Sequence, residues 1–177
     1  MGFIIKRFYS SGNKDYMENL AFVGFTLILS IGIYLRYEAL DIVRVIDFFT
    51  RDAERAFNII EQNYFPLAGP ELNNGGRLPG PFMYILLALP LLIHPSYESI
   101  FVFNFFLNIA SIPLLYVILK KSFGYCFAFL SATFFSLSLH HIQAVIMPIN
   151  PSFVFPLTVL YIWTLLNYLE KNDPKYI

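Results

Sequence analysis

The sequence has few charged residues and a single cysteine. Only 14% of its 177 residues are charged, whereas soluble domains carry about 25%. The formal net charge at pH 7 is zero, so the charge balance gives no sign of a nucleic-acid partner. One cysteine, Cys126, excludes an internal disulfide and a metal site built on several cysteines. The chain also contains no internal repeat and no low-complexity tract, which excludes repeat architectures.

Apolar and aromatic residues take the place of charge. Hydrophobic residues make up 57% of the chain and aromatic residues 19%, with 20 phenylalanines and 12 tyrosines. Aromatic rings are enriched where a membrane protein meets the lipid headgroups. We therefore predict an all-α integral membrane protein.

Four apolar runs predict about four transmembrane helices. Residues 20–36 form the first, because the uncharged run 19–35, which ends at Arg36, has about 17 residues and rises about 25 Å, just enough to cross hydrocarbon. A cleaved signal peptide is the alternative, but no A-x-A-like cleavage site follows, which favours a retained anchor. The other three runs fall within residues 98–169, at 99–119, 125–147 and 153–169.

A long polar loop, residues 37–97, separates the first two spans. Within it, residues 52–63 have apolar residues at spacings of three and four, which predicts a juxtamembrane amphipathic helix lying flat at the interface. Residues 66–81 are rich in glycine and proline, which predicts an irregular loop. Residues 81–93 are apolar but too few for a span, which is typical of a short re-entrant or interfacial helix. We expect this loop to be the working part of the chain.

The lysines favour one orientation in the membrane. All six lie before the first span, between the second and third, or after the fourth, at positions 6, 14, 120, 121, 171 and 175. If residues 81–93 do not cross, all three groups share one face, as the positive-inside rule requires. This predicts a cytoplasmic lead (1–19) and a cytoplasmic tail (170–177). The loop 37–97 and the connector 146–152 then lie on the outer face.

In this topology, polar side chains that are far apart in the sequence meet at the outer end of the bundle. Ionisable groups at membrane depth are costly, so such a cluster is a functional-site candidate. The candidates are Asp52, Glu54, Arg55, Arg77, His140, His141 and Asn150.

Four motifs in this region occur in an order seen in a known family. A D-x-x-R motif spans residues 52–55, a G-P-E stretch 69–71, a G-P-F-M-Y stretch 80–84, and an N-P connector 150–151. In this order and spacing, the chain resembles the N-terminal part of GT-C-fold glycosyltransferases that use polyprenyl-phosphate sugars. The resemblance is to the bacterial branch related to protein O-mannosyltransferases and aminoarabinose transferases, and it covers the chain from about residue 20.

The resemblance implies a function in sugar transfer. Enzymes of this family move a sugar from a polyprenyl-phosphate donor to an acceptor on the outer face of a membrane, here expected to be the bacterial inner (plasma) membrane. Asp52 matches the loop aspartate that acts as base on the acceptor hydroxyl or orients it. Its alternative role is to cap a helix N-terminus. Glu54 is a second carboxylate for acceptor or metal, or part of a solvated helix face. The sequence names no cofactor, and a divalent metal stays an open alternative.

Two arginines are candidates for binding the donor phosphate. A guanidinium can hold a phosphate through two parallel hydrogen bonds. Arg55 lies one turn from Asp52, so a plain ion pair between them is the alternative. Arg77, in the irregular loop, is an equal candidate for the phosphate.

Two histidines and an asparagine complete the predicted site. His140 and His141 form a polar cap at the end of a span, which is the simpler interpretation, or one of them hydrogen-bonds the donor phosphate or sugar. Adjacent helical residues point about 100° apart, which disfavours joint metal ligation. Asn150 belongs to the site or, with Pro151, ends one helix and starts the next.

The small number of predicted spans leaves two interpretations open, an enzyme and a non-catalytic membrane subunit. Family members run to several hundred residues with ten or more spans, whereas about four are predicted here. We expect either the N-terminal part of an enzyme, completed by further spans or a second subunit, or a non-catalytic membrane subunit that binds lipid or a partner protein. A small transporter or channel is less favoured, because the spans carry few ionisable groups and no inverted repeat. The expected partners are a polyprenyl-phosphate-linked sugar, membrane lipid and an unknown acceptor.

Overall fold

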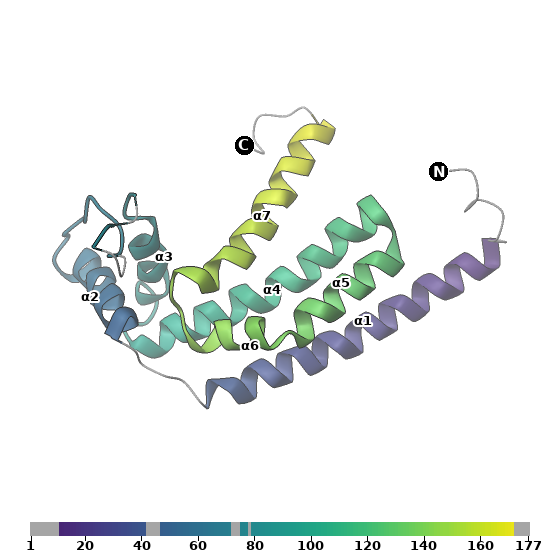
Figure 1. The fold of residues 1–177 in the computed structure, drawn as a ribbon, viewed down its shortest axis with the longest axis horizontal. Helices are drawn as coiled ribbons and strands as arrows, with labels where there is room; N and C mark the ends of the chain where they lie inside the picture. Colours follow the sequence, from purple (N-terminus) through teal and green to yellow (C-terminus); the bar gives the residue numbers. More distant parts are fainter. Residues whose placement is uncertain (1–10, 42–46, 72–74, 78, 172–177) are drawn as a thin grey trace.

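The protein is mainly helical in the part that the structure describes. The computed structural model describes residues 11–41, 47–71, 75–77 and 79–171. Within these residues there is no strand, only an isolated antiparallel bridge between Glu71 and Arg77. The helices are α1 (Ser11–Leu40), α2 (Asp47–Glu61), α3 (Phe82–Leu91), α4 (Tyr97–Phe123), α5 (Tyr125–Leu137), α6 (Leu139–Ile146) and α7 (Asn150–Lys171) (Figure 1). The predicted all-α class is confirmed.

Three described helices are long and apolar enough to cross a membrane, and two shorter ones together make a fourth candidate. The three are Tyr16–Leu40, Tyr97–Phe123 and Asn150–Glu170. The predicted span 125–147 is divided into α5 and α6, whose axes differ by 50°. These apolar helices support an integral membrane protein, whose described part has three candidate spans, or four if the bent pair counts as one.

Several helix ends differ from the predicted ones. In α1, α2 and α7 the helical backbone begins before the predicted start, whereas α3 is shorter than predicted. α1 exceeds the predicted 20–36 at both ends, since no proline lies between residues 11 and 40 to stop it. α2 starts at Asp47 rather than at residue 52, and α3 is shorter than the predicted 81–93 by one residue at its start and two at its end. α7 starts at Asn150 rather than at residue 153, because proline is tolerated in the first turn of a helix.

The long helices pack side by side. α5 lies against both α1 and α4, and α7 packs on α4 (Figure 1). Small residues allow this close approach: Ala128 and Ala132 of α5 are fully buried against Phe25 of α1 and Tyr116 of α4. The rings of Phe25 and Tyr116 stack with their centroids 4.2 Å apart. Large aromatic and small aliphatic side chains thus fill the space between these helices.

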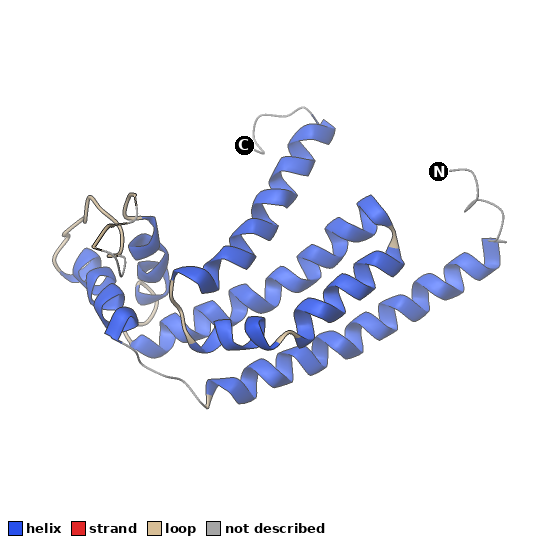
Figure 2. Cartoon of the chain, in the orientation of Figure 1, coloured by secondary structure: helices blue, strands red, loops and turns tan. Residues whose placement is uncertain are grey.

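At one end of the bundle, α2 and α3 pack together on the start of α4. The predicted amphipathic pattern is present, because Phe49, Ala53 and Ala56 form one fully buried stripe along α2. This stripe contacts Leu87 of α3 and, through the ring of Phe49, Phe101 of α4 at a centroid distance of 4.9 Å. An irregular segment joins α2 to α3, and its described residues lie at this same end (Figure 2).

The opposite end gathers three helix termini and two lysines. Lys120 at the end of α4 pairs with Glu18 of α1 at 2.5 Å, and Lys121 pairs with Glu170 of α7. The ion pairs therefore join the end of α4 to the first part of α1 and to the end of α7, and these parts lie away from α2 and α3 (Figure 1). This matches the grouping on which the predicted topology rests. A cytoplasmic location for this end stays a prediction from the positive-inside rule.

Candidate functional site

The segment between α2 and α3 folds against α2 and leaves a polar pocket of about 190 Å³. We call it the arginine pocket. Its lining residues come from α2, from the irregular segment and from the first turn of α3: Arg51, Arg55, Tyr64, Pro66, Leu67, Ala68, Glu71, Arg77 and Tyr84. Two of the predicted site residues, Arg55 and Arg77, are among them.

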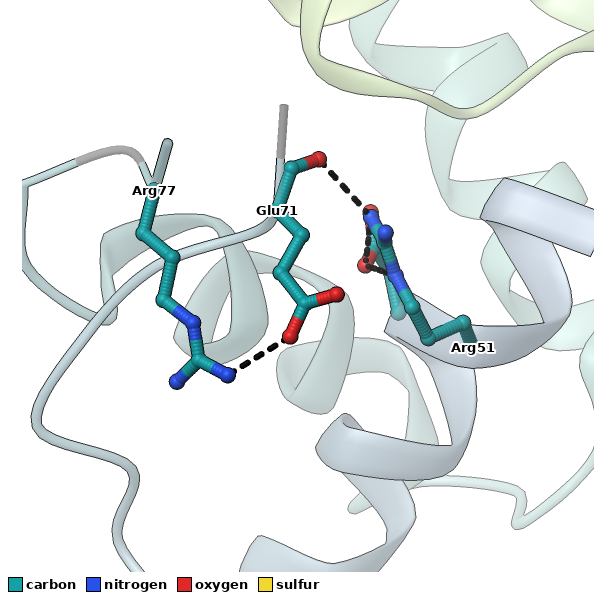
Figure 3. Close-up of polar contacts among 4 residues, drawn as sticks. Arg51, Glu71 and Arg77 are labelled. Carbon is teal, nitrogen blue, oxygen red and sulfur yellow. Dashed lines mark hydrogen bonds and ion pairs between the residues drawn. The ribbon is translucent and has the colours of Figure 1, made fainter. Parts of the chain in front are cut away.

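Arg51 ties the irregular segment to α2. Its Nε donates to Oδ1 of Asp52 at 2.9 Å, and its Nη2 lies 2.8 Å from the same oxygen. Nη2 also donates to the backbone carbonyl of Glu71 at 3.3 Å (Figure 3). The guanidinium carbon lies 5.5 Å from the centre of the Phe48 ring, within the range of a cation–π contact. One arginine therefore contacts a buried carboxylate, a loop carbonyl and an aromatic ring.

Arg77 and Glu71 close the irregular segment on itself. Their backbones form the antiparallel bridge, and Nη2 of Arg77 lies 2.6 Å from Oε1 of Glu71 (Figure 3). Both side chains are at least half exposed. An exposed ion pair of this kind contributes about 0–1 kcal/mol to stability, so a ligand can displace it at little cost.

Asp52 lies behind the pocket rather than in its lining. Its residue is 3% exposed and packs within α2, one turn inside the helix start at Asp47. The alternative N-cap role is therefore wrong, and the ion pair of Asp52 is with Arg51 instead of Arg55. Burial raises the pKa of the Asp52 carboxyl, and the hydrogen bond and charge of Arg51 offset part of that rise.

The other predicted site residues lie outside the pocket lining. Glu54 is exposed on α2, on the side away from the buried stripe. His140 is exposed at the start of α6, whereas His141 is half-buried, its ring centre 4.7 Å from that of Phe135 and 4.6 Å from that of Phe155. Asn150 is the first residue of α7. The structure thus brings Arg55 and Arg77 together with Asp52 nearby, and it places the two histidines outside this pocket, on α6.

Sequence reasoning missed the other polar lining residues as site residues, namely Arg51, Tyr64, Glu71 and Tyr84. Arg51 and Arg55 are four residues apart, which places two guanidinium groups on one face of a helix, and this spacing was a usable signal. Glu71 and Tyr84 belong to the G-P-E and G-P-F-M-Y stretches, so their motifs marked the region without giving them roles.

The pocket carries more positive than negative charge. Three guanidinium groups face it, against the carboxylate of Glu71 in the lining and that of Asp52 behind Arg51. Among the described residues, Arg55 has no ion-pair partner, so its charge is uncompensated by direct contact. Arginine forks match the geometry of phosphate oxygens, and this arrangement can bind a phosphate-bearing group. In the described part of the chain, no three His, Cys, Asp or Glu side chains lie close enough together to hold a metal ion.

No family model, curated protein or solved structure matches this chain. The resemblance to GT-C glycosyltransferases therefore rests on the sequence motifs alone.

Proposed function

We propose that this integral membrane protein binds the phosphate of a polyprenyl-phosphate-linked sugar in the arginine pocket. In this proposal the chain is a membrane glycosyltransferase, or the N-terminal part of one, that transfers the sugar to an acceptor on the outer face of the bacterial inner membrane. One observation carries the proposal, namely the convergence of Arg51, Arg55 and Arg77 in one pocket at the end of a membrane bundle.

The three arginines differ in what a phosphate has to displace. Arg55 has no ion-pair partner among the described residues, so it can engage a phosphate without losing a contact. Arg77 would give up an exposed pair with Glu71, and Arg51 would give up part of its contact with Asp52. We therefore assign the first contact to Arg55 and the second to Arg77.

The location of the pocket suits a lipid headgroup. α2 carries Arg51 and Arg55 and is held on the first turns of α4 by the contacts of Phe49 with Phe101 and of Phe57 with Tyr97. α4 is one of the apolar helices long enough to span. A pocket beside the end of a span is at the depth where lipid phosphates lie, so the hydrocarbon tail of the donor can stay in the bilayer.

Asp52 can serve as the base only after Arg51 moves. In the transfer, a carboxylate takes the proton of the acceptor hydroxyl, the acceptor oxygen bonds to the anomeric carbon, and the bond from that carbon to the phosphate oxygen breaks. Asp52 is buried and paired with Arg51 in the structure. A donor phosphate that draws Arg51 toward itself would free the carboxylate, whose pKa burial has already raised.

The burial of Asp52 favours a second candidate function. If the carboxylate stays paired with Arg51, the pocket binds the lipid phosphate without chemistry, and the chain is a non-catalytic membrane subunit that binds lipid or a partner protein. Asp52 then acts only to hold Arg51 in place.

A binding experiment tests the proposal. The purified chain in lipid nanodiscs is titrated with a fluorescent polyprenyl-phosphate sugar, with Arg55→Ala and Arg55→Lys beside the unchanged protein. Lys121→Ala, which removes a charge at the opposite end of the bundle, is the control. We expect saturable binding that weakens about tenfold or more in Arg55→Ala, is partly kept in Arg55→Lys, and is unchanged in the control. Equal binding by all four proteins, or no saturable binding, would overturn the proposal.

Transfer in membranes separates the two candidate functions. With Asp52→Asn, an enzyme loses sugar transfer to the acceptor while donor binding is retained. If the chain is a lipid-binding subunit, its complex shows the same activity with the unchanged protein and with Asp52→Asn.

A further inference from the structure

The fourth candidate span is broken at a place where its own sequence gives little reason for a break. α5 ends at Leu137 and α6 starts at Leu139, with a 50° bend between them. Neither glycine nor proline occurs between Tyr125 and Met147. Sharp kinks without these residues arise where a side chain inserts into the backbone hydrogen-bond ladder.

A break within an apolar segment leaves carbonyl groups without helical partners, which is costly away from water. The break creates a helix C-terminus at the end of α5, and the bent segment has a second C-terminus where α6 ends at Ile146. The structure supplies a donor side chain from a neighbouring helix to each of them.

Arg36 of α1 donates hydrogen bonds to the carbonyl groups at the end of α5. Its side chain is almost fully buried at 1% exposure, and its Nη1 donates to the carbonyl of Ser136 at 2.8 Å while Nη2 donates to that of Phe135 at 2.9 Å. Nη1 also donates to the carbonyl of Gly32, one turn back on α1, at 2.9 Å. A cation at a helix C-terminus also interacts favourably with the helix dipole.

Gly32 allows this contact. A Cβ atom at this position would lie 3.0 Å from Cβ of Ser136 and 3.3 Å from Nη1 of Arg36. A side chain at position 32 would crowd Ser136 and Arg36, so glycine favours the close approach of the two helices.

Asn104 of α4 donates hydrogen bonds to the carbonyl groups at the end of α6. It is fully buried, and its Nδ2 donates to the carbonyls of Ala144 at 2.9 Å and Val145 at 3.1 Å. Asn108, one turn further along α4, donates to the side-chain oxygen of Asn104 at 2.9 Å. This second bond fixes the orientation of the Asn104 amide, so that its NH₂ group faces α6.

We propose that Arg36 and Asn104 are positioning residues that hold the fourth span broken, each satisfying the C-terminus of one half. The break also affects packing at the end of the protein where α2 and α3 lie. Residues 147–149 follow α6 directly, and Ile149 and Phe153 pack on the cluster that contains Phe49 of α2. The break thereby helps to place the start of α7 against the apolar cluster on which α2 and α3 also pack. This inference does not depend on what the pocket binds.

Distance measurements across the break test the inference. The native Cys126, which is exposed, and a cysteine introduced at the exposed position of Gln143 carry spin labels in the full chain in nanodiscs. Rejoining of α5 and α6 into one straight helix would lengthen the backbone separation by about 2 Å. We expect Arg36→Leu and Asn104→Leu each to lengthen or broaden the distance distribution, and to speed amide exchange in residues 139–146 about tenfold or more. Arg55→Leu, which removes an exposed guanidinium elsewhere, should leave both unchanged.

Two further variants keep the test decisive if Arg36→Leu does not fold. Gly32→Ala retains the guanidinium but moves α1 away from Ser136, and it should shift the distance distribution in the same direction. Arg36→Lys keeps the charge and part of the hydrogen bonding, and it should lie between the unchanged protein and Gly32→Ala in amide exchange. Unchanged distances and exchange in the folded variants of both Arg36 and Asn104 would overturn the inference and assign the break to the α5–α6 sequence itself.

Discussion

Arg51 and Asp52 are adjacent in the sequence, yet one faces the pocket and the other is buried behind it. Nε and Nη2 of Arg51 lie 2.9 and 2.8 Å from the same oxygen of Asp52, and the side chains are 31% and 5% exposed. The carboxylate of Asp52 therefore orients the guanidinium of Arg51, which lines the pocket. In turn, this guanidinium separates the carboxylate from the pocket. A functional role proposed for Arg51 must therefore be compatible with the role proposed for Asp52, and the reverse.

Replacing Asp52 by asparagine should separate these roles. The asparagine side chain can still accept one hydrogen bond from Arg51, but the charge that competes with a phosphate for Arg51 is gone. We expect donor binding to be equal or a few-fold tighter and sugar transfer to fall about 100-fold or more, since positioned bases contribute about that much. Binding titration and a transfer assay on the same membranes measure the two effects. Weaker donor binding in Asp52→Asn would instead show that the carboxylate is needed to orient Arg51.

The raised pKa of Asp52 predicts a pH dependence of stability. The folded protein binds a proton at Asp52 at a higher pH than the unfolded chain, for which the usual value is 3.8. The contribution of this group is therefore fully present below 3.8 and is lost as the pH rises through the folded pKa. We expect the unchanged protein to gain stability relative to Asp52→Asn as the pH falls from neutrality into this range. Chemical unfolding of both proteins at several pH values measures the difference, and a difference that is flat or of opposite sign would contradict the prediction.

Glu71 should act as an internal competitor for the ligand of Arg77. The pair is exposed, so Glu71→Gln should change the free energy of unfolding by less than about 1 kcal/mol. The same substitution removes a negative charge from the pocket lining, and a phosphate-bearing ligand should bind several-fold more tightly. Glu54→Gln is the matched control, because Glu54 is exposed on α2 but does not line the pocket. An equal gain in affinity for both variants would mean that overall charge, not the contact with Arg77, is responsible.

Structural features that depend on a local sequence pattern could be predicted from the sequence. The apolar runs predicted three spans and the region of a fourth, and the spacing of Ala53 and Ala56 predicted the buried stripe of α2. The pairs of Lys120 with Glu18 and of Lys121 with Glu170 place the end of α4 near the first part of α1 and the end of α7, whereas the side of the membrane on which they lie stays a prediction.

The remaining features depend on contacts between residues far apart in the chain. The break after α5 relies on Arg36, 100 residues from Ser136, and on Asn104, 41 residues from Val145. No pattern within residues 125–147 carries that information. The partner of Asp52 was also missed, since the helix was predicted to start at residue 52, whereas α2 starts at Asp47 and Asp52 lies inside it.

Two neighbouring phenylalanines offer a test of how α2 is held. Phe49 is fully buried between α2, α3 and α4, whereas Phe48 is 47% exposed beneath the Arg51 guanidinium. Phe49→Ala removes a buried ring and should lower the free energy of unfolding by about 3–5 kcal/mol. Phe48→Ala loses mainly the cation–π contact and should cost about 1 kcal/mol.

The same pair shows whether the arginine pocket depends on the packing of α2. If α2 detaches in Phe49→Ala, donor binding should be lost while α1, α4 and α7 stay inserted, because their apolar surfaces lie elsewhere. Phe48→Ala should keep binding within a few-fold. Unfolding in detergent, protease access to residues 62–81 and donor titration on both variants measure these effects. Equal behaviour of the two variants would mean that the buried ring of Phe49 does not hold α2 on the bundle.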